Sequence, residues 1–334
     1  MVDFARRELL RLALGTAALP VGVLSLGVLS LAARTASALD YPSRPVRIVV
    51  SLPAGLAPDI DARLIAQPLA QRLGQSVVIE NRPGANSNIG TEFVVKAPPD
   101  GYTLLLLLAG NAINTTFYPN LSFSLARDLV PVAFVGSTSW IMALNPAVPA
   151  QTVPEFIAYS KANPGKVYLA SPGIGSPAHL AGELFKMMTG ASFVHVPYRQ
   201  SYLPDLLGGQ VHLTFAAVAS LGDYIQTGKL RALGLTTKAR SSRLPAVPAI
   251  DEFVPGYEAS GWLGISAPQG TPAAIVEKLN TCINAAIGDP DVKAKLLGLD
   301  VEPQAMAPSK FGKFIADETD KWAKVIKFAN IKPQ

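Results

Sequence analysis

The sequence predicts an α/β fold, and three observations support this class. From Arg44 onward, apolar runs of strand length alternate with stretches whose apolar residues recur at helical spacing. One run, 102–107, contains four consecutive leucines, as in buried strands of parallel sheets. The chain has 334 residues, which is enough for two lobes with separate cores.

The first part of the chain alternates strands and helices. Strands are predicted at 46–50, 77–80 and 102–107, and a short helix at 88–96. Between the first two strands, a helix begins near Asp59, whose carboxylate suits the positive end of the helix dipole. Pro68 is expected to kink or interrupt this helix. The apolar residues expected on its buried face are Ile60, Leu64, Ile65, Leu69 and Leu73.

The middle of the chain repeats this alternation, and the end returns to long helices. Strands are predicted at 140–144, 167–170, 193–196, 211–215 and 230–235, and helices at 153–163 and 179–189. Thr271 is expected to cap a helix that has Pro272 at its first position and ends at Gly288. A terminal helix at 309–328 has one apolar face, which should clamp onto a lobe.

The first 38 residues have the pattern of an export signal. Arg6 and Arg7 precede an almost purely apolar run from Leu12 to Ala33, and Ala36 to Ala38 offer a small-residue cleavage site. The paired arginines are similar to those of twin-arginine signals. The run is also long enough for a retained membrane anchor. Pro20 and the glycines in the run favour cleavage after Ala38, and we see no second apolar stretch of spanning length beyond it.

Charge and motifs exclude several classes of function. Without residues 1–38 the chain keeps 25 basic and 22 acidic side chains, a net charge of +3 that is too mild to indicate nucleic-acid binding. Cys282 is the only cysteine and lies in an apolar helical pattern, so we interpret it as a small buried side chain. The three histidines show no zinc-ligand spacing, and no nucleophile elbow or phosphate-binding loop occurs. We therefore expect no catalytic residue, metal or cofactor.

Two loops are candidates for binding an anion. Each is rich in Gly and Pro and connects a predicted strand to a helix, so that backbone N–H groups near the helix start can face a carboxylate. The candidate contacts in the loop 51–59 are Leu52, Pro53, Gly55 and Leu56. Those in the loop 171–179 are Ser171, Gly173, Gly175 and Ser176. Taken alone, each loop is a weak signal, because most such loops are plain turns.

Other polar side chains near strand ends have two interpretations. Asn111 follows a buried strand, where it could contact a ligand or cap a turn. Tyr198 and Arg199 follow another strand, and Arg199 could pair with a carboxylate or simply be exposed. We expect Arg63 in a structural ion pair. His179 is expected to be a helix-end residue with satisfied hydrogen bonds.

Four segments resemble the Bug-type receptors, the extracytoplasmic binding components of tripartite tricarboxylate transporters. They are NRPGANSNIG (81–90), PPDGYTLLL (98–106), LLGGQV (206–211) and GKLRALGLTT (228–237). Further stretches are HVPYR (195–199), PGYEASGWLGISAPQGTP (255–272) and the C-terminal FIADETDKWAKVIKFANIKPQ. The resemblance spans about 41–332, essentially the whole chain after the signal, and it rests on the order and spacing of these segments.

The resemblance implies a type II periplasmic-binding fold, in which two lobes close over a ligand like a Venus flytrap. Lobe one would comprise 41–139 plus 261–334, and lobe two 140–260, with crossings near Ser139–Trp140 and Ser260–Trp262. It implies a monomeric periplasmic solute-binding protein that captures a small organic acid for membrane permease subunits. Two alternatives stay open: a ligand sensor for a signalling partner, or an enzyme on the same bilobed fold.

The chain departs from the family at positions that bear on the ligand. The first loop has Leu52 and Gly55–Leu56 where relatives usually carry Phe and Gly-Gly. Gln200 replaces a usual glycine, and the connection to Asp205 is about two residues shorter. Ala216 replaces an expected aspartate after the strand 211–215, and it counts among the candidate contacts. We therefore expect a less polar carboxylate, aromatic or longer-chain, rather than a small amino acid or a citrate-like ligand.

Overall fold

The structure is a computed structural model that describes residues 41–238, 240–241 and 244–333. The predicted signal at 1–38 and its cleavage site lie outside the described residues. Pro42–Gln334 form one compact unit, to which every element below belongs.

The first sheet has six strands in the order β11-β4-β10-β3-β1-β2. Strand β1 pairs in parallel with β2 and β3, whereas β10 runs antiparallel to β3 and β4, and β11 antiparallel to β4. The bounds are β1 Val46–Val50, β2 Val77–Asn81, β3 Thr103–Leu108, β4 Leu129–Thr138, β10 Gly261–Pro268 and β11 Val301–Pro303.

The second sheet has five strands in the order β7-β6-β8-β5-β9. Strand β6 is parallel to β7 and β8, and β5 is antiparallel to β8 and β9. The bounds are β5 Trp140–Leu144, β6 Tyr168–Ser171, β7 Val194–Pro197, β8 Leu213–Ala217 and β9 Arg231–Leu235.

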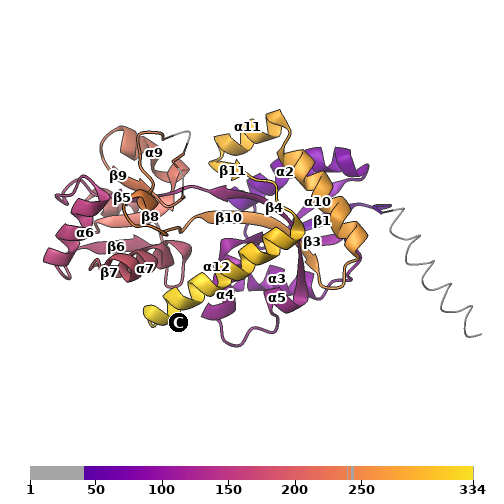
Figure 1. The fold of residues 1–334 in the computed structure, drawn as a ribbon, viewed down its shortest axis with the longest axis horizontal. Helices are drawn as coiled ribbons and strands as arrows, with labels where there is room; N and C mark the ends of the chain where they lie inside the picture. The colour runs from indigo at the N-terminus through magenta and orange to yellow at the C-terminus, as the bar shows by residue number, and fades with distance from the viewer. Residues whose placement is uncertain (1–40, 239, 242–243, 334) are drawn as a thin grey trace, which may run out of the picture. The chain divides into compact units, whose positions relative to one another are not determined.

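Helices cover the two sheets, as Figure 1 shows. Near the first sheet, α2 packs against α10 and α11, and α12 packs against α4. The helices there are α2 Ala57–Leu73, α3 Asn88–Val95, α4 Ala109–Phe117, α5 Leu125–Asp128, α10 Ala273–Ile287, α11 Pro290–Gly298 and α12 Pro308–Phe328. Near the second sheet are α6 Val153–Ala162, α7 Pro177–Thr189, α8 Leu203–Leu207 and α9 Val218–Gln226. Two short 3-10 helices are η1 Ala85–Ser87, between β2 and α3, and η2 Ile250–Glu252, between β9 and β10.

The chain passes between the sheets on neighbouring strands. It leaves the first sheet at the end of β4, reaches the second at β5, and returns on β10, which pairs with β4 from Gly261↔Thr138 to Pro268↔Leu129. The α/β class with two sheets is therefore confirmed. The residue boundaries of the two lobes stay a prediction.

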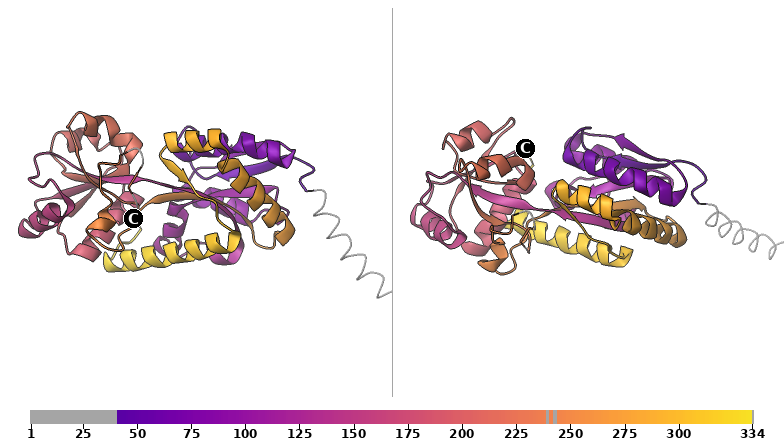
Figure 2. Two further views of the ribbon diagram at one scale, coloured as in Figure 1. Left: turned by 45° about the horizontal axis from the view of Figure 1, so that its top comes forward. Right: turned by 90° about the horizontal axis from the view of Figure 1, so that it is seen from above.

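The terminal helix contacts elements of both sheets, which is more than was predicted. It was expected to clamp onto one lobe, but α12 packs against α4 and β4 of the first sheet and against α7 beside the second. Both views of Figure 2 show the yellow helix α12 alongside elements of both sheets. Its buried Trp322, Val325 and Ile326 share an apolar cluster with Phe117 of α4 and the core of the second sheet.

Helix α2 corrects two local predictions. Pro68 lies inside it, yet the helix runs without interruption from Ala57 to Leu73, so the expected interruption is wrong and a kink stays a prediction. Ile65, Leu69 and Leu73 are buried as expected, but Ile60 is 44% exposed and Asp61 is buried in its place. The buried stripe includes Asp61, Ala62, Ile65, Ala66 and Leu69, so the helix turns Ile60 outward.

Thr271 was predicted to cap α10, but the cap position belongs to Pro272 and the helix begins at Ala273. The Thr271 hydroxyl instead donates to the Pro268 carbonyl, at 2.8 Å. Gly288 ends the helix as predicted. None of the helices in the described part of the chain is long and apolar enough to span a membrane.

Candidate ligand-binding site

The first candidate loop is held in place by polar side chains behind it. The Gly55 N–H donates to Oδ2 of Asp59 at 2.9 Å, and Nδ2 of Asn81 donates to the Leu52 carbonyl at 3.0 Å. These two hydrogen bonds clamp the loop, and Arg63 joins them. Its Nη2 lies 2.9 Å from Oδ1 of Asp59 and donates to Oδ1 of Asn81 at 3.1 Å. The expected structural ion pair of Arg63 is thus confirmed. The Gly55 N–H, predicted to face a ligand, is occupied by Asp59.

The same contacts set the charge of the first loop. Hydrogen bonds from Arg63 foremost, together with the Gly55 N–H, lower the pKa of Asp59 to about 2, although burial opposes this shift. Asp59 is buried and negative at neutral pH, and its charge is compensated by Arg63. Pro53, Gly55 and Leu56 are exposed, and Leu52 is half-buried.

The second candidate loop follows β6 and leads into α7. Oγ of the fully buried Ser171 lies 3.1 Å from the Gly173 N–H and 3.0 Å from the Gly173 carbonyl. Ser176 is the N-cap of α7, where its Oγ accepts the His179 N–H. The Gly175 N–H, another predicted ligand contact, donates to Nδ1 of His179 at 3.1 Å. His179 is therefore a helix-end residue with satisfied hydrogen bonds, as expected.

Gly175 is fixed by its surroundings as well as by its backbone. Its φ of +75° belongs to the left-handed region. A Cβ at this position would lie 2.6 Å from Cζ of Phe117. Phe117 ends α4, so the second loop rests directly on a helix of the first sheet. Only glycine fits this contact.

Helix α4 links the two candidate loops through the segment 84–91. Asn114 of α4 donates from Nδ2 to the Asn86 carbonyl at 2.6 Å and to Oδ1 of Asn88 at 3.0 Å. A Cβ on Gly90 would lie 2.8 Å from Cβ of Ser51, which begins the first loop. The first loop therefore contacts α3, α3 contacts α4, and α4 contacts the second loop. The segment is strained, since Ala85, Asn86 and Ser87 have φ of 45°, 52° and 75°.

Asn111 makes the hydrogen bonds that are expected of a capping residue. It is 3% exposed, its Oδ1 accepts the Leu108 N–H at 2.8 Å, and its Nδ2 donates to Oγ1 of Thr91 at 2.9 Å. These two bonds fix the start of α4 against α3. A ligand contact from Asn111 stays a prediction.

The remaining predicted contacts lie in β8 or just after β7 of the second sheet. The Tyr198 hydroxyl donates to Oδ2 of Asp205 at 2.7 Å, and burial foremost, with this bond, raises the pKa of Tyr198 to about 12. Ala216 is 8% exposed and belongs, with Tyr198, to an apolar cluster that includes Leu206 of α8 and Leu221 of α9. Arg199 is exposed. The Tyr198 N–H also donates to the Ser171 carbonyl at 2.9 Å, which places Tyr198 beside the start of the second loop.

Exposed apolar side chains flank the first loop. Leu56 is 48% exposed and Ile60, one turn later on α2, is 44% exposed. Ile89 at the start of α3 is 52% exposed. Exposed apolar side chains are informative where they gather in one place, since contiguous apolar surface marks binding sites.

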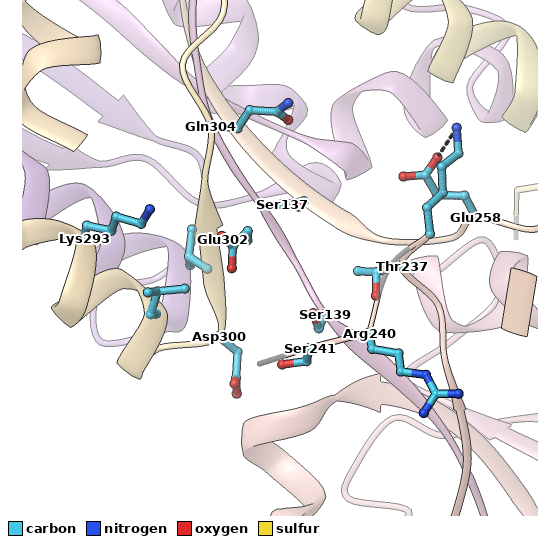
Figure 3. Close-up of a pocket in the computed structure, with 13 residues that line it drawn as sticks. Ser137, Ser139, Thr237, Arg240, Ser241, Glu258, Lys293, Asp300, Glu302 and Gln304 are labelled. Atoms are coloured by element: carbon cyan, nitrogen blue, oxygen red, sulfur yellow. Dashed lines mark ion pairs between the residues drawn. The ribbon is translucent and has the colours of Figure 1, made fainter. Parts of the chain in front are cut away.

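A separate cavity of about 650 Å³ lies beside the strands that connect the sheets, as shown in Figure 3. Lys293, Asp300 and Glu302 come from α11, β11 and their connection, whereas Thr237, Lys238, Arg240 and Ser241 follow β9. Lys238 and Arg240 are paired with Glu258 and Glu252. None of the twelve predicted ligand contacts lines this cavity. Within the described ranges, no group of three or more His, Cys, Asp or Glu could hold a metal ion.

The clamps behind the loops were not predicted. Asn81 ends β2 and therefore lies at the carboxyl edge of the parallel strands, which is a signal that the sequence offers. His195 lies within β7 and gave no signal, since its contact with Ser171 joins residues that are 24 positions apart.

Comparison with known proteins identifies the family. Residues 61–331 match the model of the tripartite tricarboxylate transporter family receptor. BugT of Bordetella pertussis is 37% identical over 301 residues, which cover 89% of this chain and 92% of BugT.

Two solved structures have the same fold. The R. palustris protein Rpa4515 with adipate has a TM-score of 0.74 at 36% identity and covers 88% of this chain and 100% of its own. MatC from Rhodopseudomonas palustris with bound malate has a TM-score of 0.70 at 28% identity, covering 86% and 100%. The chain therefore belongs to the tripartite tricarboxylate transporter receptors, the Bug-type family of periplasmic solute-binding proteins.

Proposed function

We propose that the protein captures a small organic anion through its carboxylate, between lobe one (41–139 plus 261–334) and lobe two (140–260). The observation that carries this proposal is the pair of loops 52–56 and 171–176. Each follows a parallel strand, where open α/β sheets bind ligands, and each is held by buried side chains behind it. The relatives solved with adipate and malate support a carboxylate ligand.

The ligand has a substantial hydrocarbon body. Leu56, Ile60 and Ile89 offer exposed apolar surface beside the first loop, and burying it against a ligand would be favourable. Adipate, a six-carbon chain between two carboxylates, has this character. An aromatic or longer-chain acid is therefore favoured over a small amino acid or citrate.

The protein works as a monomer without cofactor or enzymatic activity and hands its ligand to membrane permease subunits. Export would follow from the predicted signal, cleaved after Ala38. Family membership supports the transport role, because the matching model describes receptors of a transporter.

The test begins with native mass spectrometry of the protein as purified, which would reveal any retained acid. Isothermal titration then compares adipate and benzoate with citrate and aspartate. Binding of adipate or benzoate in preference to the other two is expected. Tight binding of citrate or aspartate, with no binding of aromatic or long-chain acids, would contradict the proposed ligand class.

Arg199→Ala tests the second lobe's contribution. Arg199 is exposed, so its removal should leave folding intact while removing a bidentate partner of the carboxylate. Affinity should fall about tenfold to a hundredfold, the range of a charge-assisted hydrogen bond. The matched control is Lys293→Ala, an exposed cation that lines the cavity of Figure 3 and should leave affinity unchanged. If affinity fell in Lys293→Ala and not in Arg199→Ala, the ligand would bind in that cavity instead.

A further inference from the structure

Two of the three histidines of this chain form a stacked pair behind the second candidate loop. The rings of His179 and His195 lie 3.6 Å apart between centroids, with an interplanar angle of 9°. They come from different elements, since His179 is in the first turn of α7 and His195 is in β7. The pair therefore ties the helix that follows the loop to the strand beside β6.

Each ring holds a different part of the loop. Nδ1 of His179 accepts the Gly175 N–H at 3.1 Å. Nε2 of His195 lies 2.6 Å from Oγ of Ser171, and this hydroxyl in turn contacts both the N–H and the carbonyl of Gly173. Together the rings determine the directions of the backbone groups of residues 171–175.

We propose that the stacked His179–His195 pair positions the ligand-binding loop of lobe two, and that the pair must be neutral for the loop to bind its carboxylate. This inference rests on the proposed function and adds two residues that position the site without touching the ligand.

Neutrality follows from the hydrogen bonds. Because Nδ1 of His179 accepts an N–H, the ring carries its proton on Nε2, which faces Oε1 of Glu183 at 3.5 Å. A second proton on Nδ1 would point at the Gly175 N–H and break that bond. It would also place a cation against the face of His195, where burial foremost lowers the pKa to about 3.

The charged groups that face the pair come from α7. Glu183 is 5% exposed and pairs with Lys186 at 2.5 Å. Burial alone would raise the pKa of Glu183, but hydrogen bonds with His179 and Lys186 outweigh it and lower the pKa. The carboxylate of Glu183 is thus already compensated by Lys186. A protonated His179 would be an additional positive charge beside this ion pair.

The experiment compares His179→Leu with His179→Asn. Leucine fills the space but leaves the Gly175 N–H without its acceptor, whereas the asparagine side-chain oxygen can replace Nδ1 and does not titrate near neutral pH. Adipate affinity at about pH 8 should fall about tenfold in His179→Leu, the typical effect of one lost buried hydrogen bond, and should stay within about threefold of wild type in His179→Asn. Equal losses in both variants would overturn the proposal.

The pH profile separates positioning from a merely structural role. Imidazole is the side chain that most readily gains a charge on acidification. Wild-type affinity should therefore fall more steeply than that of His179→Asn as the pH is lowered. The variant corrects for protonation of adipate itself. Parallel profiles would contradict the neutral pair.

Hydrogen exchange of the Gly175 amide in the ligand-free protein tests the pair independently of any ligand. This amide should be protected in wild type and His179→Asn and exposed in His179→Leu. If wild type binds none of the acids, the proposed function fails, yet this pattern would still support the pair. If wild type binds and the Gly175 amide exchanges equally in all three proteins, the proposal for the histidine pair is wrong and the proposed function stands.

Discussion

The carboxyl group of Asp61 is buried in α2 without compensation. Asp61 is 3% exposed, and its Oδ1 has no hydrogen-bond partner among the described residues. Burial raises its pKa from 3.8 to about 7. Between these pH values the native state holds a proton that the unfolded chain releases. Stability therefore falls as pH rises from about 3.8 to about 7, and the full cost is present above pH 7.

Asp61→Asn should stabilise the protein at alkaline pH. The amide keeps the size of the side chain and removes the charge, so the free energy of unfolding should rise by about 1–3 kcal/mol at pH 8 and hardly change at pH 4. Urea unfolding at both values measures this. Asp223→Asn, on an exposed residue, should change neither. A gain of equal size at both pH values would mean that the charge of Asp61 is not the cause.

At the scale of single residues, the sequence predicted the candidate loops but not what holds them. Gly and Pro at 53–55 and 172–175 indicated turns between a strand and a helix, which the structure contains. The clamps by Asn81 and His195 join residues that are 29 and 24 positions apart, and periodicity carries no information on such pairs. Ile60 faces outward beside Leu56, although helical spacing had predicted it in the core.

Among the elements, α12 packs against α4 and β4 of the first sheet and against α7 beside the second, and Glu318 holds it. Its Oε2 accepts the indole N–H groups of Trp262 in β10 and Trp322 in α12, each at 3.1 Å. Its Oε1 pairs with Lys321, whose Nζ also donates to the Glu258 carbonyl at 3.0 Å. Glu318 is 6% exposed, so removing it leaves buried donors without acceptors.

Glu318→Ala should destabilise the protein by about 2–4 kcal/mol, because two indole N–H groups and an ammonium lose their partner. Thermal unfolding followed by circular dichroism is the measurement. Asp317→Ala removes the neighbouring exposed carboxylate, which pairs only with Lys313 in the described contacts, and should change stability by less than about 0.5 kcal/mol. Similar losses in both variants would show that Glu318 has no special role.

Strands were predicted best where the sequence is rich in apolar residues. The runs that became β1, β3 and β5 were predicted to within one residue at each end, because each has at most one polar residue. The ten-residue strand β4 was missed, as were β10 and β11: β4 contains Pro131, and β10 contains Gly264. Strands β4 and β10 form the connection between the sheets, and their pairing is determined by tertiary contacts that no local pattern contains.

On the scale of the whole molecule, the two sheets are already joined on one side by apolar packing. Phe117 of α4 and Trp322 of α12 lie in the core cluster of the second sheet. The connecting strands β4 and β10 are hydrogen-bonded to each other along their length. We expect the lobes to rotate about these fixed contacts, with ligand contacts from both loops favouring the closed state.

Small-angle X-ray scattering with and without saturating adipate tests most directly whether the ligand is captured between the lobes. A decrease in the radius of gyration on binding is the result we predict, and Arg199→Ala should require more adipate to reach it. An unchanged radius, with binding verified by calorimetry on the same sample, would contradict capture between the two loops.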